Sequence, residues 1–190
     1  MKSVEIIGFK RANLGKAESK ALRAEGNVPC VVYGGKGEVH FYSPMILFRD
    51  LVYTPNAYFV ELNIEGDVRH CVLQDIQFHP VSEIIMHADF LELNDKKPLK
   101  MDIPVRVEGT SPGVQKGGKL MMKQRKLTVK ALPKNMPEEI TIDISDLDLG
   151  KSIKVSHIQA GDFEFLVSPN LPVASVVVPR ALRGKQQDQD

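Results

Sequence analysis

Polar side chains gather between residues 74 and 89, in a stretch that otherwise has the pattern of two short β-strands. Four of them precede Pro80 and two follow it: Gln74, Asp75, Gln77, His79, His87 and Asp89. His87 and Asp89 are two residues apart, so on a strand they point to the same face. Together they offer hydrogen-bond donors and acceptors, and no obvious nucleophile accompanies them. This combination is typical of a surface that reads the polar groups of another molecule.

Catalysis is the alternative for these residues. In its sharpest version, His87, Asp89 and His157 form a two-histidine, one-carboxylate metal centre on a β-rich scaffold, and a local group with His79 is a second version. His157 falls in what we expect to be another domain, whereas a metal centre needs a preformed set of ligands. The chain also lacks a nucleophile elbow, a P-loop, a paired-cysteine zinc pattern and a dinucleotide-binding fingerprint. We therefore expect no catalytic residue, no metal and no cofactor.

A basic helix is predicted near the N-terminus. The run A-E-S-K-A-L-R-A-E consists of good helix formers, and Gly26 follows where a C-terminal cap belongs. Lys16, Lys20 and Arg23 recur at spacings of four and three, so they share one face of this helix. Arg11 lies in the loop before it. Such a face suits the phosphates of a nucleic acid, although a solvated surface or a site for an acidic protein would have the same pattern.

The strand after this helix ends on an aromatic ring and a glycine turn. The run P-C-V-V-Y is β-like, and Tyr33 is followed directly by Gly34 and Gly35. The tyrosine offers a flat ring and a hydroxyl group, and glycines allow a second backbone to approach closely. Beside the basic helix, this turn favours nucleic-acid binding.

Charge is strongly segregated although the net charge is only +1. Residues 2–36 hold seven Lys or Arg against three acids, and residues 37–94 hold two against nine. Residues 116–134 hold seven basic residues and no acid. Separate basic blocks in a balanced protein favour contacts with phosphate backbones. The 116–134 block also alternates like two strand edges, so its lysines would serve equally well for edge protection.

The elements that position these residues are mainly strands. Apolar alternation and turn residues predict six strands and two short helices in the first half, the strands covering 3–9, 29–33, 39–42, 58–64, 68–76 and 84–93. The polar segment N-D-K-K-P is the best boundary. We expect a first domain over 1–94, a β-rich domain over 95–180 with strands spaced as in sandwiches or barrels, and a polar, disordered tail over 181–190.

The cysteines and the apolar runs indicate in which cellular compartment the protein is expected. Cys30 and Cys71 each lie inside an apolar, β-like run, which favours free, buried thiols in a reducing compartment, although their spacing leaves a disulfide open. The N-terminus lacks the apolar core of a signal peptide. No stretch approaches the ~20 apolar residues that a membrane span needs. We expect a soluble, cytoplasmic protein.

Several motifs in fixed order resemble one family. The first half reads R-x-x-x-G-K, a basic L-R helix, V-P-C-V-V-Y-G-G, Q-D-I-Q-F-H-P and H-A-D-F. The second half reads G-T-S-P-G-V-Q-K-G-G-K-L, A-L-P-K-N-M-P-E-E-I-T-I-D-I-S and L-G-K-S-I-K-V. Over residues 3–178 the chain resembles the bacterial large-subunit ribosomal protein L twenty-five, in its longer Ctc or general stress protein form.

This resemblance implies a fold, a function and a set of contacts. The fold would be mainly β, with an N-terminal six-stranded β-barrel-like domain that binds 5S ribosomal RNA near its irregular loop E helix, and a β-rich C-terminal domain. The cations Arg11, Lys16, Lys20 and Arg23 would hold the phosphate backbone, and Tyr33, Gly34 and Gly35 would lie against the RNA. The six polar residues of 74–89 would fall on or behind the RNA-facing surface.

The same resemblance implies the partners. These are 5S rRNA and the large ribosomal subunit, with neighbouring ribosomal proteins as further candidates, and neither a membrane nor a small-molecule substrate. The protein would then be a structural constituent rather than an enzyme. A protein-binding stress factor is the remaining alternative.

Overall fold

The computed structural model of the chain describes residues 1–35 and 37–179. The described residues divide into two compact units, one formed by Met1–Met101 with Leu132–Glu138, the other by Asp102–Ala131 with 139–179. The domain boundary expected after residue 94 stays a prediction. The expected disorder of 181–190 lies outside the described residues.

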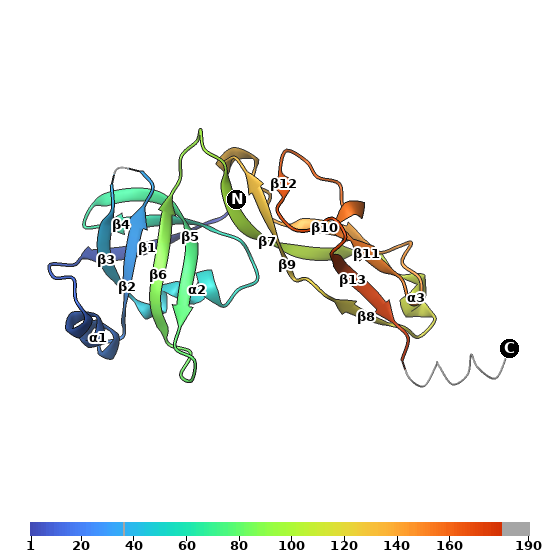
Figure 1. The fold of residues 1–190 in the computed structure, drawn as a ribbon, viewed down its shortest axis with the longest axis horizontal. Helices are drawn as coiled ribbons and strands as arrows, with labels where there is room; N and C mark the ends of the chain where they lie inside the picture. Colours follow the sequence, from blue (N-terminus) through green and yellow to red (C-terminus); the bar gives the residue numbers. More distant parts are fainter. Residues whose placement is uncertain (36, 180–190) are drawn as a thin grey trace. The chain divides into compact units, whose positions relative to one another are not determined.

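The first unit is built around a closed six-stranded β-barrel, as predicted (Figure 1). Its strands are β1 (Ser3–Lys10), β2 (Asn27–Tyr33), β3 (Val39–Pro44), β4 (Phe59–Ile64), β5 (Asp67–Phe78) and β6 (Ile85–Glu92). They follow the order β1-β3-β2-β6-β5-β4, and parallel pairing of β1 with β4 closes the ring. Among the described residues, closure leaves these six strands without an open sheet edge that could pair with another chain.

Alternation along each strand fills the barrel. In β4, every second side chain is buried, and the core draws on all six strands: Ile6, Val28, Cys30, Val32, Phe41, Val60, Leu62, Ile64, Cys71, Ile85, Ala88 and Phe90. Burial of each large apolar side chain is worth about 1.5–3 kcal/mol. The β4–β5 hairpin turns at Glu65 and Gly66, both with positive φ (52° and 94°), as a tight two-residue turn requires.

Both cysteines are free thiols inside this core, as predicted. Burial, with a smaller contribution from the nearby Glu92 carboxylate, raises the pKa of the Cys71 thiol to about 12. Burial likewise raises the pKa of Cys30 well above its usual value, with a smaller contribution from Asp89. The thiols therefore stay protonated and act as small apolar side chains.

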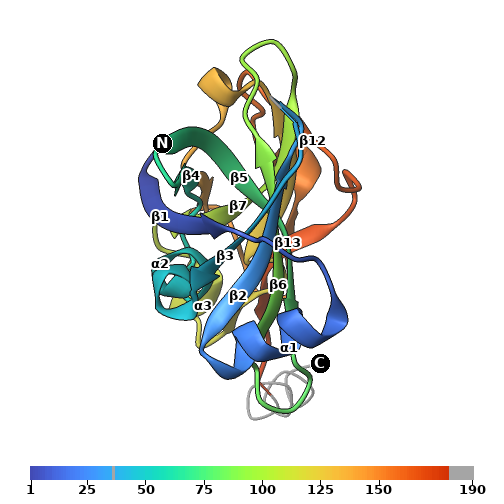
Figure 2. The same ribbon diagram turned by 90° about the vertical axis from the view of Figure 1, so that its left-hand side faces the viewer.

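Two helical segments flank the barrel. Helix α1 (Lys16–Ala24) buries Leu22, and the chain leaves it through Gly26, whose φ is +80°. The basic helix predicted over 17–25 is thus confirmed within one residue. The second segment consists of a 3-10 turn, η1 (Met45–Phe48), which runs into α2 (Arg49–Val52). In Figures 1 and 2, α1 and the β5–β6 turn lie at the same end of the barrel.

The second unit is also β-rich, as predicted. Its elements are β7 (Leu99–Glu108, which begins in the first unit), α3 (Pro112–Gln115), β8 (Lys119–Met122), β9 (Lys126–Ala131), β10 (Ile140–Asp143), β11 (Ser152–Lys154), η3 (Val155–His157), β12 (Glu164–Phe165) and β13 (Pro172–Val177). They form a four-stranded sheet in the order β10-β7-β9-β12 and a three-stranded sheet in the order β11-β13-β8. A 3-10 turn, η2 (Pro133–Asn135), belongs to the segment that returns to the first unit.

The basic block 116–134 supplies β8 and β9. Strand β8 lies at the edge of its sheet, as edge protection predicts, whereas β9 lies between β7 and β12, so the expectation of a second edge was wrong. Lys116 is engaged in an ion pair, its Nζ donating to Asp148 Oδ1 at 2.9 Å. Across the part of the chain that the structure describes, no helix is both long and apolar enough to cross a membrane.

Candidate nucleic-acid interface

The register between β5 and β6 aligns four of the polar residues in two cross-strand pairs. Asp75 lies opposite Asp89, and Gln77 lies opposite His87. Asp75 and Gln77 are exposed, and His87 and Asp89 are half-buried. Their neighbours in sequence, Ile76 and Ala88, are also a cross-strand pair and pack in or against the core. The four polar side chains therefore share the outer face of the barrel.

His87 and Asp89 contact each other directly. His87 Nδ1 lies 2.6 Å from Asp89 Oδ1, which confirms that the two residues share a face. With the proton on Nδ1, the imidazole donates to the carboxylate and its Nε2 is left as an acceptor. Asp89 in turn faces Asp75 across the strands, and like charges in that position are destabilising without a partner. The arrangement is suited to a ligand that brings hydrogen-bond donors.

Strand β2 extends this face on the other side of β6. Parallel pairing sets Val31 beside Asp89 and Tyr33 beside Leu91. Tyr33 is half-buried, and its burial raises the pKa of its phenol, with smaller contributions from the Asp89 and Asp75 carboxylates. Its hydroxyl therefore remains a donor at neutral pH. We call Tyr33, Asp75, Gln77, His87 and Asp89 the polar face.

Gln74 owes its position to an irregularity in the sheet. The β5–β6 register shifts between Leu73 and Asp75, so Gln74 is the extra residue of a bulge. Leu73 packs against the core, whereas Gln74 and Asp75 are consecutive and both exposed. The bulge thus adds an amide next to the polar face.

His79 has a structural task in the β5–β6 turn. Its Nδ1 accepts hydrogen bonds from the backbone N–H groups of Val81 (3.4 Å) and Ser82 (3.2 Å). The backbone N–H of His79 donates to the Ile84 carbonyl at 2.8 Å. Nothing in the local sequence distinguishes His79 from His87 in this respect.

The basic residues of and before α1 are fixed to different degrees. Lys16 and Lys20 are exposed, whereas Arg23 is half-buried and its Nε donates to the Met86 carbonyl at 3.0 Å. Because Met86 precedes His87, this bond attaches α1 to β6 next to the polar face. Arg11 Nη2 donates to Ser19 Oγ at 3.1 Å, a contact that the sequence did not suggest. Among the described residues, no hydrogen-bond acceptor meets the buried Nε of Arg11.

Gly34 and Gly35 pack closely against the end of β6. Gly34 has a φ of +98°, and a Cβ there would lie 2.6 Å from Leu91 Cδ1. A Cβ on Gly35 would overlap the Glu92 carboxylate. The turn after Tyr33 therefore packs against the end of β6 in a way that other residues would disturb.

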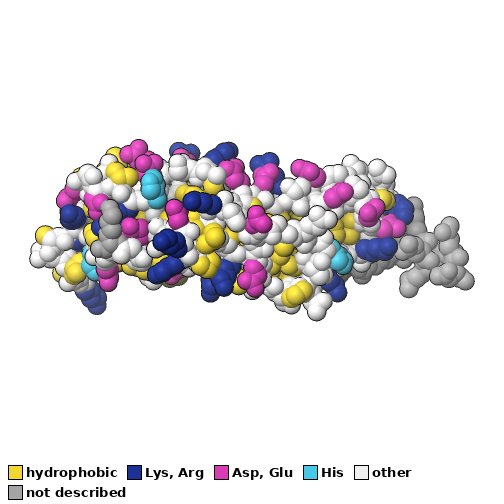
Figure 3. Space-filling view, turned by 90° about the horizontal axis from the view of Figure 1, so that it is seen from above, with side chains coloured by type: hydrophobic (Ala, Val, Ile, Leu, Met, Phe, Trp, Pro, Cys, Tyr) yellow, Lys and Arg dark blue, Asp and Glu magenta, His cyan; other side chains and the backbone are white. Residues whose placement is uncertain are grey.

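Surface charge by itself does not locate a binding site. In the face of the molecule shown in Figure 3, basic and acidic side chains are interspersed.

Comparison with known proteins identifies the family. Residues 6–90 match the family model described as Ribosomal L25p family, and residues 98–180 match Ribosomal protein TL5, C-terminal domain. The chain is 56% identical over 183 residues to the large ribosomal subunit protein bL25 of Amoebophilus asiaticus, covering 96% of this chain and 93% of that one. It is 54% identical over 186 residues to the bL25 of Cytophaga hutchinsonii, covering 98% and 97%. The bL25 of Phocaeicola vulgatus is 42% identical over 191 residues, covering 97% and 96%.

The chain belongs to the bL25 family.

The match to both family models confirms the long, two-domain form of bL25 that the sequence motifs predicted. bL25 proteins are structural ribosomal proteins, so this chain is not an enzyme. His157, the third ligand of the metal alternative, belongs to η3 in the second unit. Within residues 1–35 and 37–179, no group of three or more His, Cys, Asp or Glu side chains is placed to hold a metal ion.

Proposed function

We propose that this chain is a structural constituent of the large subunit of the cytoplasmic ribosome, and that its N-terminal barrel binds and stabilises 5S rRNA in the loop E region. The observation that carries the proposal is the polar face beside α1. There Asp75 and Gln77 pair with Asp89 and His87, and the Arg23–Met86 bond attaches a basic helix to the same strand. The relatives' name, large ribosomal subunit protein bL25, supports the assembly.

The basic residues of and before α1 and the residues of the polar face would contact RNA through different chemistry. The exposed Lys16 and Lys20 would contact phosphates, together with Arg11 and Arg23, whose guanidinium groups are already oriented by Ser19 and Met86. Such contacts position a protein on RNA without reading its sequence.

Carboxylates cannot serve that purpose, because phosphates repel them. Asp75 and Asp89 would instead accept hydrogen bonds from base amino or imino groups or from 2′-hydroxyls. The base groups become accessible where an RNA helix departs from regular pairing, which is where sequence-specific RNA recognition concentrates. An irregular helix such as loop E therefore suits this face better than a regular duplex does.

The remaining candidates would act around this centre. Gln77, His87 and the bulged Gln74 would supply further donors and acceptors, and the Tyr33 ring and hydroxyl would lie against the RNA. Gly34 and Gly35 would follow Tyr33 along the contact. His79 would act through the shape of the β5–β6 turn, because its Nδ1 is already engaged.

Substitutions in the polar face test this proposal. His87→Ala or Asp89→Ala should weaken the binding of isolated 5S rRNA by about 1–3 kcal/mol each, the cost of a hydrogen-bonding partner left unpaired at a desolvated contact. The affinity is measured by gel shift with the full chain, and folding by circular dichroism.

The matched controls are His157→Ala and Asp162→Ala, which change exposed residues of the second unit. Both controls should bind like the unaltered protein. Unchanged affinity in folded His87→Ala and Asp89→Ala would refute the assignment of these residues.

A further inference from the structure

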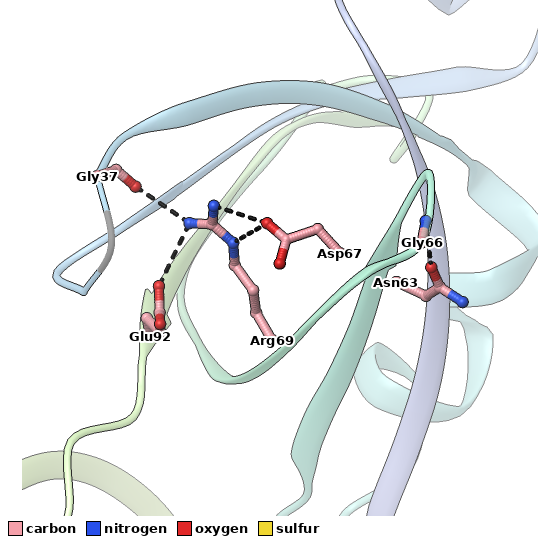
Figure 4. Close-up of polar contacts among 6 residues, drawn as sticks. All are labelled: Gly37, Asn63, Gly66, Asp67, Arg69 and Glu92. Atoms are coloured by element: carbon pink, nitrogen blue, oxygen red, sulfur yellow. Dashed lines mark hydrogen bonds and ion pairs between the residues drawn. The ribbon is translucent and has the colours of Figure 1, made fainter.

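Arg69 is a nearly buried arginine of β5 that is not part of the polar face. Its side chain is 7% exposed. Its Nε and Nη2 donate to Asp67 Oδ2 at 2.9 and 2.8 Å. Its Nη1 donates to Glu92 Oε2 at 3.3 Å and to the Gly37 carbonyl at 3.2 Å. One guanidinium group thus joins β5, the end of β6 and the turn between β2 and β3 (Figure 4).

Charge balance makes this network rigid. A guanidinium group removed from water is costly unless carboxylates and hydrogen bonds compensate it, and removal of one partner leaves a buried charge. Here the planar guanidinium of Arg69 donates hydrogen bonds to two carboxylates and one carbonyl. These three acceptors lie on different elements and together fix its orientation. Lysine, a point charge, could not reproduce this geometry.

The network holds the turn that follows Tyr33. Arg69 binds the carbonyl of Gly37, which has a φ of +125°. The Glu92 carboxylate, oriented by Arg69, occupies the space where a side chain on Gly35 would lie. The turn is therefore bonded to β5 and packed against β6. Tyr33, which directly precedes this turn, belongs to the polar face, so the network holds one end of that face in place.

We infer that Arg69 is a positioning residue for RNA binding, which holds the Tyr33–Gly35 turn in its binding geometry through Glu92 and the Gly37 carbonyl. This inference rests on the proposed function. The guanidinium is too buried and too fully paired to neutralise a phosphate. Loss of Arg69 should consequently lower RNA affinity without changing the number of phosphates that the protein neutralises, which the salt dependence of binding measures.

The test uses the full chain with Arg69→Met and with the double variant Arg69→Met/Glu92→Gln. The double variant also removes the charge of the carboxylate that Arg69 Nη1 contacts, so it remains informative if the single variant fails to fold. Arg49→Met, at an exposed arginine of α2, is the matched control. Two measurements are compared: backbone ¹⁵N order parameters at Gly34, Gly35 and Gly37, and 5S rRNA affinity over a range of salt concentrations.

We expect the order parameters of the three glycines to fall from about 0.85, the value of a rigid backbone, towards 0.6. The affinity for 5S rRNA should fall about tenfold, with an unchanged slope of log Kd against log salt. Arg49→Met should leave both unchanged. Rigid glycines and full affinity in the folded double variant would overturn the inference. So would a slope of log Kd against log salt that is smaller by the amount expected for the loss of about one phosphate contact.

A third result separates this inference from the proposed function. If the unaltered protein does not bind 5S rRNA, the proposed function fails, and with it the RNA part of the inference. The order parameters then still decide whether Arg69 holds the turn, because they are measured without RNA.

Discussion

At the scale of single residues, side chains of the same type have different tasks. His87 Nδ1 contacts Asp89 on the polar face, whereas His79 Nδ1 accepts two backbone N–H groups within a turn. Arg23 attaches α1 to β6, and Arg69 is enclosed by two carboxylates. Residue type alone therefore says little about which histidine or arginine would meet RNA. Their places in the fold distinguish them: an outer sheet face, a turn, a helix and a carboxylate network.

Gly34 provides a test at this scale. Gly34→Ala should destabilise the barrel by more than about 1 kcal/mol, because a Cβ would be strained at a φ of +98° and would collide with Leu91. Gly15→Ala is the matched control, since Gly15 has an extended backbone and nothing lies within 4 Å of a Cβ there. Urea denaturation measures the free energy of unfolding of both variants. Equal stability of the two variants would show that the turn does not need a glycine at residue 34.

Most of the first unit's elements follow from local sequence, whereas the site depends on pairing between distant strands. Alternation predicted the six strands, and the helix formers before Gly26 predicted α1. Nothing local to residues 74–89 reveals the bulge at Gln74, because it exists only relative to β6. The Arg69–Gly37 contact likewise joins residues 32 positions apart, so only the folded barrel brings them together.

The thiols test how well the barrel strands exclude water. The pKa of Cys71 is about 12 in the folded chain, and its usual value is 9.0, so the unfolded chain releases this proton first as pH rises. Protonation of Cys71 therefore supports the fold fully below pH 9, and this contribution is lost progressively as pH rises towards 12.

Two measurements examine this expectation. Native protein at pH 8 should resist a disulfide reagent that labels both thiols in urea. The free energy of unfolding should decline more steeply above pH 9 for the unaltered protein than for Cys71→Ala. Rapid labelling of the native protein, or identical pH dependence in the two proteins, would contradict a sealed core.

At the scale of the whole molecule, membership of the bL25 family and a closed barrel with a polar outer face both support the proposed role in the large ribosomal subunit. The closed barrel presents the polar face on its outer side. The second unit is β-rich and matches its own family model, but its partner does not follow from its sheets. The return of Leu132–Glu138 to the first unit is a feature of the tertiary fold that local patterns did not indicate.

The proposed recognition of the irregular loop E of 5S rRNA by the barrel can be tested by replacing loop E itself. The most direct test compares the full chain's affinity for 5S rRNA with its affinity for a 5S rRNA whose loop E is replaced by Watson–Crick pairs of equal length, at ~0.15 M salt. The affinity should fall about 100-fold, because the carboxylates of Asp75 and Asp89 would face regular phosphates and closed base pairs, and only non-specific phosphate binding would remain. Equal affinity for the two RNAs would contradict the proposed recognition.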